Sequence, residues 1–139
     1  MKVAINRCFG GFDLSIKAVL RYAELSGFKL YPCVQIDHDF RNPRYRVVDD
    51  PAHYNDTLFV HFSTELPDKL GNIEDSTYWS ERDIKRTDPI LIKVIEELGL
   101  EVNTSVSKIE IIEIPDGIEW GIDDYDGLET VEEKHRSWS

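Results

Sequence analysis

Apolar side chains recur along this chain with two periods, one typical of helices and one typical of strands. Residues 16–26 and 89–98 place apolar side chains three and four positions apart, which predicts two amphipathic helices. Asp88 and Pro89 provide a start signal for the second helix, and Gly99 provides its stop signal. The pattern therefore predicts two main helices.

Short apolar or alternating runs around these helices predict strands. The last two runs flank Pro115-Asp116-Gly117, so we expect them to form a hairpin, followed by a docked tail from residue 123. The fold class is therefore α+β, a single domain over residues 1–139 with a small mixed or antiparallel sheet of about five strands. The predicted strands cover residues 3–5, 28–36, 57–64, 107–114 and 118–122.

Charge is spread unevenly along the chain, whose formal net charge is -11. Residues 1–48 carry a net charge of +4 and residues 49–139 a net charge of -15. Such asymmetry favours contact between the two halves, within one subunit or between subunits, so we expect a homo-oligomer. The acidic balance argues against nonspecific nucleic-acid binding, which needs a broad basic face.

The cellular compartment is predicted from cysteine usage and from apolar run lengths. Cys8 and Cys33 are the only cysteines, and we expect both to be reduced. No run approaches the roughly 18 apolar residues of a membrane-spanning helix, and the N-terminus lacks the apolar core of a signal peptide. We therefore expect a cytoplasmic protein that does not bind a membrane.

The loop between the first strand and the first helix is a candidate anion site. Gly10 and Gly11 allow a tight turn, and Asn6 and Arg7 precede them. Such a loop can direct backbone N–H groups and a helix N-terminus at an anion. It matches neither the dinucleotide fingerprint nor the P-loop, so a plain strand-to-helix turn is an equal alternative.

Two further basic clusters extend this candidate to a three-sided pocket. Arg82 and Arg86 precede the second helix, and His135 and Arg136 lie near the C-terminus. Such side chains can bind phosphate groups, and Trp79 can stack on a base. The alternative is that the arginines pair with the abundant surface carboxylates.

We expect neither a metal ion nor a cofactor. Asp37, His38 and Asp39 are metal-ligating residue types, but neighbouring residues on a strand point to opposite faces, so at most two of them can converge. A solvated turn explains them better. The acidic residues between 110 and 133 are explained by a solvated face.

Three segments resemble a family of small proteins encoded by phages and prophages. They are VAINRCFGGFDLS at residues 3–15, RDIKRTDPILIKVIEELG at 82–99 and EIPDGIEWGIDDYDGLETVEEKHRSW at 113–138. The resemblance implies an accessory role, such as countering host defence in the host cytoplasm. Combined with the candidate anion site, it suggests a protein that binds and sequesters a small nucleotide-type signal without chemistry.

Two other functions remain open at this point. An acidic protein can mimic DNA or inhibit a host factor, which would place the function on the carboxylates of residues 110–133. Alternatively, a small nucleotide-processing enzyme could use His61 or His135 for acid–base chemistry and Arg7 as an electrophilic clamp. We expect a binding protein rather than an enzyme, with no catalytic residues.

Overall fold

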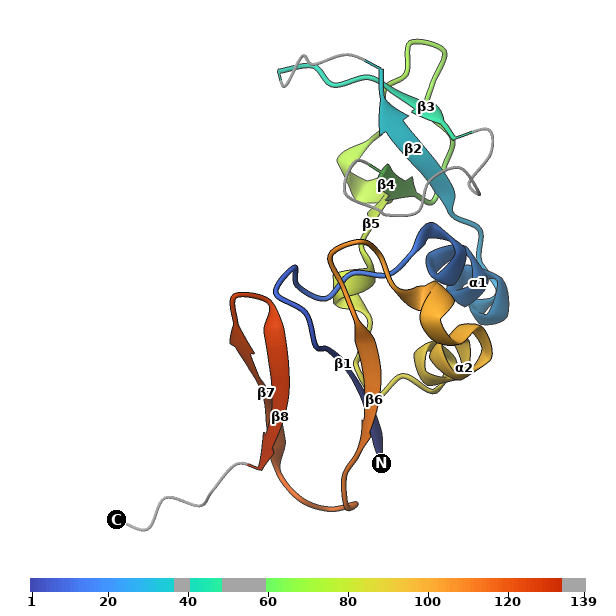
Figure 1. The fold of residues 1–139 in the computed structure, drawn as a ribbon. Helices are drawn as coiled ribbons and strands as arrows, with labels where there is room; N and C mark the ends of the chain where they lie inside the picture. Colours follow the sequence, from blue (N-terminus) through green and yellow to red (C-terminus); the bar gives the residue numbers. More distant parts are fainter. Residues whose placement is uncertain (37–40, 49–59, 134–139) are drawn as a thin grey trace.

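The computed structural model describes residues 1–36, 41–48 and 60–133 (Figure 1). The α+β class, the two main helices and the antiparallel pairing are confirmed. The strands of the described residues are more numerous than predicted and have different bounds, and they form three small sheets in place of one. Their bounds are β1 Lys2–Asn6, β2 Tyr31–Gln35, β3 Tyr45–Val47, β4 Val60–Ser63, β5 Tyr78–Trp79, β6 Ile109–Glu113, β7 Trp120–Tyr125 and β8 Leu128–Glu133.

The helices begin and end where the sequence signals lie. In α1 (Ile16–Ser26) the Ser15 hydroxyl accepts from the Ala18 backbone N–H, and Gly27 closes the helix at a φ of 84°. In α2 (Pro89–Leu98) the Asp88 carboxylate accepts from two backbone N–H groups. Neither α-helix of the described residues has both the length and the apolar content needed to cross a bilayer.

Short 3-10 helices also join these elements, three of them in the part of the chain that the structure describes. They are η2 (Asp75–Thr77), η3 (Glu81–Asp83) and η4 (Gly99–Val102). The side-chain oxygen of Ser80 accepts from the Arg82 backbone N–H at 3.2 Å, which fixes the start of η3. This short element therefore has a defined orientation directly after β5.

Antiparallel pairing brings distant parts of the chain together. β1 pairs with β6, with Lys2 opposite Glu113 and Asn6 opposite Ile109. A second sheet has the strand order β3-β2-β4-β5, and β7 pairs with β8 in a third. Both helices lie beside β1 and β6, and one apolar core joins Ala4 of β1 to Leu91 of α2 (Figure 1).

The prediction of a hairpin around Pro115-Asp116-Gly117 is wrong, because β6 and β7 belong to different sheets. The hairpin is instead β7–β8, which turns at Asp126 and Gly127 with φ values of 50° and 90°. Two positive φ values in succession fit an Asp-Gly turn. Residues 123–133, predicted as a docked tail, therefore form part of a hairpin, and residues 134–139 lie outside the described residues.

A buried ion pair holds this hairpin against β1. Nη2 of Arg86 donates to Oε2 of Glu129 at 2.8 Å, and Oε1 of Glu129 accepts from the Asn6 backbone N–H at 2.8 Å. The Arg86 guanidinium also lies 3.7 Å from the centre of the Phe12 ring. The Glu129 side chain is only 5% exposed, so its charge depends on Arg86 for compensation.

Candidate ligand-binding cleft

Asn6, predicted at the mouth of an anion site, is completely buried. Its amide nitrogen donates to the backbone oxygens of Cys8 and Gly127 at 2.6 and 2.7 Å. Its Oδ1 accepts from the backbone N–H groups of Cys8 and Lys108. These four bonds use the full capacity of a primary amide, so Asn6 joins β1 to the β7–β8 turn and to the segment before β6.

The glycine loop packs closely against other backbone. A Cβ on Gly10 would overlap Val106, and a Cβ on Gly127 would overlap the backbone of Gly11. Gly11 itself has a φ of 93°, which disfavours other residues. The two glycines therefore allow a close-packed strand-to-helix turn, the alternative weighed for this loop.

The predicted basic residues lie in different surroundings. Arg7 is half-exposed, with Nε 4.0 Å from the Glu110 carboxylate, and Arg86 is held by Glu129. His135 and Arg136 lie outside the described residues. Of the predicted site residues that the structure describes, Trp79 and Arg82 line a common cleft.

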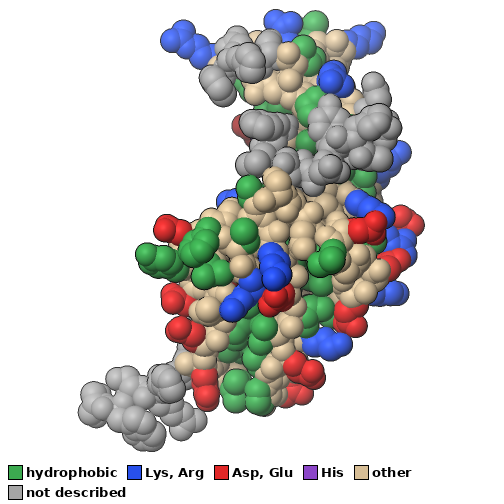
Figure 2. All heavy atoms as spheres, in the orientation of Figure 1, with side chains coloured by type: hydrophobic (Ala, Val, Ile, Leu, Met, Phe, Trp, Pro, Cys, Tyr) green, Lys and Arg blue, Asp and Glu red, His purple; other side chains and the backbone are tan. Residues whose placement is uncertain are grey.

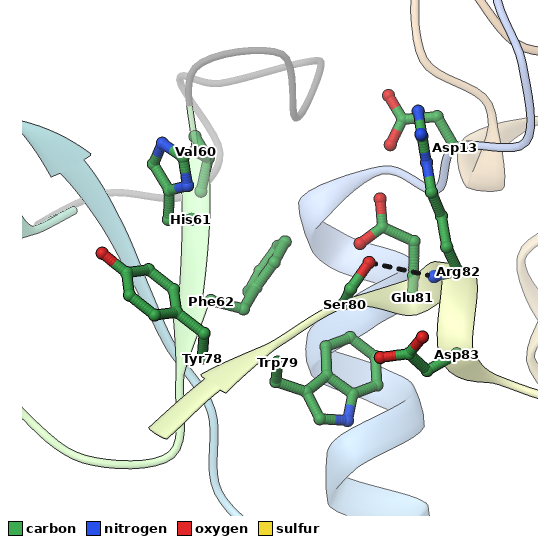
Figure 3. A pocket seen from close by; sticks show the side chains of 10 residues that line it. All are labelled: Asp13, Val60, His61, Phe62, Tyr78, Trp79, Ser80, Glu81, Arg82 and Asp83. Atoms are coloured by element: carbon green, nitrogen blue, oxygen red, sulfur yellow. Dashed lines mark hydrogen bonds between the residues drawn. The ribbon is translucent and has the colours of Figure 1, made fainter. Parts of the chain in front are cut away.

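This cleft has a volume of about 490 Å³ and lies between β4, β5, η3 and the loop that precedes α1 (Figure 3). Strand β5 pairs with Phe62 and Ser63 of β4, so the first half of β4 borders the cleft. Its volume falls within the ~300–1,000 Å³ typical of small-ligand sites. The short length of β5 therefore leaves room for a ligand beside the sheet.

Two buried carboxyl groups face each other in the wall of this cleft. Asp13 and Glu81 are each 8% exposed. Burial, followed by the hydrogen bond and negative charge of Asp13, raises the pKa of Glu81 to about 8. Glu81 therefore holds a proton at neutral pH and can donate a hydrogen bond, as a buried carboxylic acid does in several enzymes.

The backbone around both carboxyls is anchored. The Ser107 hydroxyl donates to the Asp13 backbone oxygen at 2.7 Å, and the Ser15 backbone N–H donates to Val102. Glu81 lies at the start of η3, where the Ser80 cap fixes the turn. In Figure 3 the Glu81 carboxyl and the Arg82 side chain both extend toward Asp13. The cleft therefore carries its charged groups on anchored backbone.

Aromatic rings form the opposite wall. Tyr78 is exposed, and its ring centre lies 6.1 Å from Tyr45 and 6.2 Å from His61. Desolvation lowers the pKa of His61 below its usual value, so this imidazole is neutral at pH 7. Trp79 packs its ring against Phe62 at 6.2 Å and against α1. The cleft thus offers ring surface at one end and ionisable groups at the other.

The charges in the cleft do not favour a highly anionic ligand. Arg82 and Asp83 carry opposite charges, Glu81 and His61 are neutral at pH 7, and Asp13 adds one negative charge. The arrangement can therefore hold an aromatic, hydrogen-bond-donating ligand with one anionic group at Arg82 more readily than a polyphosphate.

The sequence interpretation missed Asp13 and Glu81 as a pair. Neither residue is among the candidates predicted from the sequence, because Asp13 lies in the loop after Gly11 and Glu81 lies in a stretch of mixed charge. Sixty-eight positions separate them in the sequence, so no local spacing indicates their contact. The available signal was the position of Glu81, two residues after the aromatic pair Tyr78-Trp79, because segments that connect strands and helices often carry functional groups.

The described residues contain no group of three or more His, Cys, Asp or Glu side chains arranged to hold a metal ion. Asp37, His38 and Asp39 lie outside the described residues. Comparison with protein-family models, curated proteins and solved structures gives no match for this chain. The function proposed next is based on the geometry of the cleft.

Proposed function

We propose that this protein binds a nucleotide-type small molecule in the cleft between β4, β5 and η3. The observation that supports this most is the combination of exposed ring surface at Tyr78, buried carboxyls at Asp13 and Glu81, and the cation of Arg82 around one volume of about 490 Å³. A base contacts the rings and carboxyls, and a single phosphate group contacts Arg82.

The biological role follows from the resemblance to small phage-encoded proteins. We propose that the chain acts in the host cytoplasm as an anti-defence protein, sequestering a nucleotide-type signal and leaving it chemically unchanged. A homo-oligomer, expected from the uneven charge, stays a prediction. On the face shown in Figure 2, Lys and Arg gather at the upper end and acidic side chains lie in the lower part, so this face is not uniformly acidic, which gives less support to DNA mimicry.

A second candidate function is a nucleotide-processing enzyme. The specific observation in its favour is Glu81, a buried carboxyl that is protonated at neutral pH beside the cleft and next to the carboxylate of Asp13. His61 also borders the cleft. Arg7 does not line it, so the clamp expected of Arg7 would have to come from Arg82.

Thermal unfolding with a panel of nucleotides tests both functions. We expect at least one ligand among the four ribonucleoside 5′-monophosphates and the cyclic dinucleotides to raise the midpoint of unfolding in a concentration-dependent way. Chromatography of the same mixture shows whether the ligand is recovered intact, as a binder requires, or converted. A panel without any stabilising member would contradict the proposed function.

Charge reversal at Arg82 tests the location of the site. We expect Arg82→Glu to weaken nucleotide binding at least tenfold, because it removes the cation that contacts the phosphate and adds repulsion. Lys85→Glu is the matched control, since it changes the net charge equally at an exposed residue three positions away that does not line the cleft. Equal losses in both variants would show a general charge effect.

A further inference from the structure

The walls of the cleft differ in their hydrogen-bonding character, and this difference points to a class of base. Asp13 offers carboxylate oxygens, which only accept hydrogen bonds. Glu81 lies beside it at the same 8% exposure, and its carboxyl has one acceptor oxygen when protonated and two when it loses its proton. Two acceptors side by side are complementary to two neighbouring N–H donors on one planar edge.

Among nucleobases, guanine presents that edge, since its ring imino N–H and its exocyclic amino group lie next to each other. Adenine presents an acceptor nitrogen beside its amino group and would face a carboxylate with a lone pair. Hypoxanthine keeps the imino N–H and lacks the amino group. A site built to hydrogen-bond a donor discriminates strongly against an analogue without it, because its buried polar groups are then left unpaired.

We propose that the Asp13–Glu81 carboxyl pair, which lines the cleft, recognises the imino and amino N–H groups of a guanine-type base. The inference rests on the proposed function, because it needs a nucleotide-type ligand in the cleft. It adds to the proposed function the identity of the bound base and the release of one proton on binding. In the free protein one proton bonds the two carboxyls; in the complex the proton leaves to solvent and two ligand N–H groups take its place.

The proton balance depends on every charged group that faces Glu81. Asp13 comes from the loop before α1, Arg82 and Asp83 come from η3, and His61 and Tyr78 border the cleft from β4 and β5. Asp13 favours the protonated form of Glu81, and Arg82 opposes it. Neutral donors on a ligand act in the same direction as Arg82, because they stabilise carboxylate oxygens. Binding and proton release are therefore coupled.

Calorimetric titration of the full chain with guanosine, inosine and adenosine 5′-monophosphates tests this. At pH 7 we expect GMP to bind about tenfold more tightly than IMP and more than tenfold more tightly than AMP. In two buffers with different ionisation enthalpies, GMP binding should release close to one proton at pH 7 and clearly fewer at pH 8.5, where Glu81 is already largely ionised in the free protein and the guanine imino N–H is still present. This measurement uses the wild-type protein and needs no variant to fold.

Glu81→Gln supplies the second readout. We expect it to abolish proton release and to reduce the preference for GMP over AMP, while the exposed control Glu74→Gln keeps both. Equal affinity for GMP and AMP, or binding without proton release at pH 7, would overturn the inference and leave the proposed function standing. Binding of none of the three monophosphates would overturn the inference, and failure of every member of the nucleotide panel as well would overturn the proposed function.

Discussion

Replacing Arg86 by Met is expected to lower the free energy of unfolding by about 3–5 kcal/mol, the usual cost of removing one partner from a buried ion pair. Glu129 would keep a charge that is almost fully shielded from water and would retain only the Asn6 backbone N–H as a partner. The Phe12 ring would also lose its guanidinium contact. Urea unfolding monitored by circular dichroism measures the loss.

Two controls separate the charge effect from lost packing. Lys17→Met removes an exposed ion pair with Glu101 and should leave the free energy of unfolding almost unchanged, because both side chains are solvated. Combining Arg86→Met with Glu129→Gln removes both charges and keeps an acceptor for Asn6. We expect this double variant to recover most of the stability. A double variant as unstable as Arg86→Met would contradict the uncompensated charge as the cause.

Replacing Glu81 by Gln is expected to change how stability depends on pH. The folded protein holds the proton of Glu81 up to about pH 8, whereas the unfolded chain loses it near 4.5. Between these values the folded state binds more protons, so wild-type stability falls as pH rises through this window and levels off above it. Glu81→Gln cannot ionise, and its amide can donate to Asp13.

At pH 9 we therefore expect Glu81→Gln to be more stable than wild type by about 2–4 kcal/mol, and at pH 5 the two proteins should be similar. Urea unfolding at pH 5, 7 and 9 measures this difference. Glu74→Gln is the control, because it removes an exposed carboxyl outside the cleft and should follow the wild-type profile. Parallel profiles for wild type and Glu81→Gln would show that Glu81 is ionised in the folded protein at neutral pH.

The helices could be predicted from the sequence because their signals are local. Asp88 and Pro89 start α2, Gly99 ends it, and each acts through atoms within one turn. Ser15 and Gly27 do the same for α1. The α+β class followed from these helices and from the alternating runs between them.

The strand pairing could not be predicted in the same way. β1 pairs with β6 more than 100 residues later, and nothing near Lys2 specifies Glu113 as its partner. The β7–β8 hairpin did have a local signal, the Asp126-Gly127 pair, which is among the strongest short turn signals. The acidic character of residues 123–133 obscured it, since charged strands on an exposed sheet resemble a tail.

The candidate site was predictable only in part. Trp79 and Arg82, predicted as ligand-binding residues, line the cleft, whereas Asn6 and Arg86 bond other residues of the fold; ligand binding itself stays a prediction. The sequence shows that an arginine is present, but it does not show which carboxylate the arginine contacts in the folded protein. The Asp13–Glu81 pair could not be predicted for the same reason, because the two residues come together only when the chain folds.

One measurement tests most directly whether the cleft binds a nucleotide. The indole N–H signals of the tryptophans can be followed by NMR while GMP is added to the wild-type protein. Trp79 lines the cleft, and Trp120 lies on β7 outside it. We predict a saturable shift of the Trp79 signal with no change at Trp120. A shift at Trp120 alone, or no shift of either signal at millimolar GMP, would contradict a guanine nucleotide in this cleft.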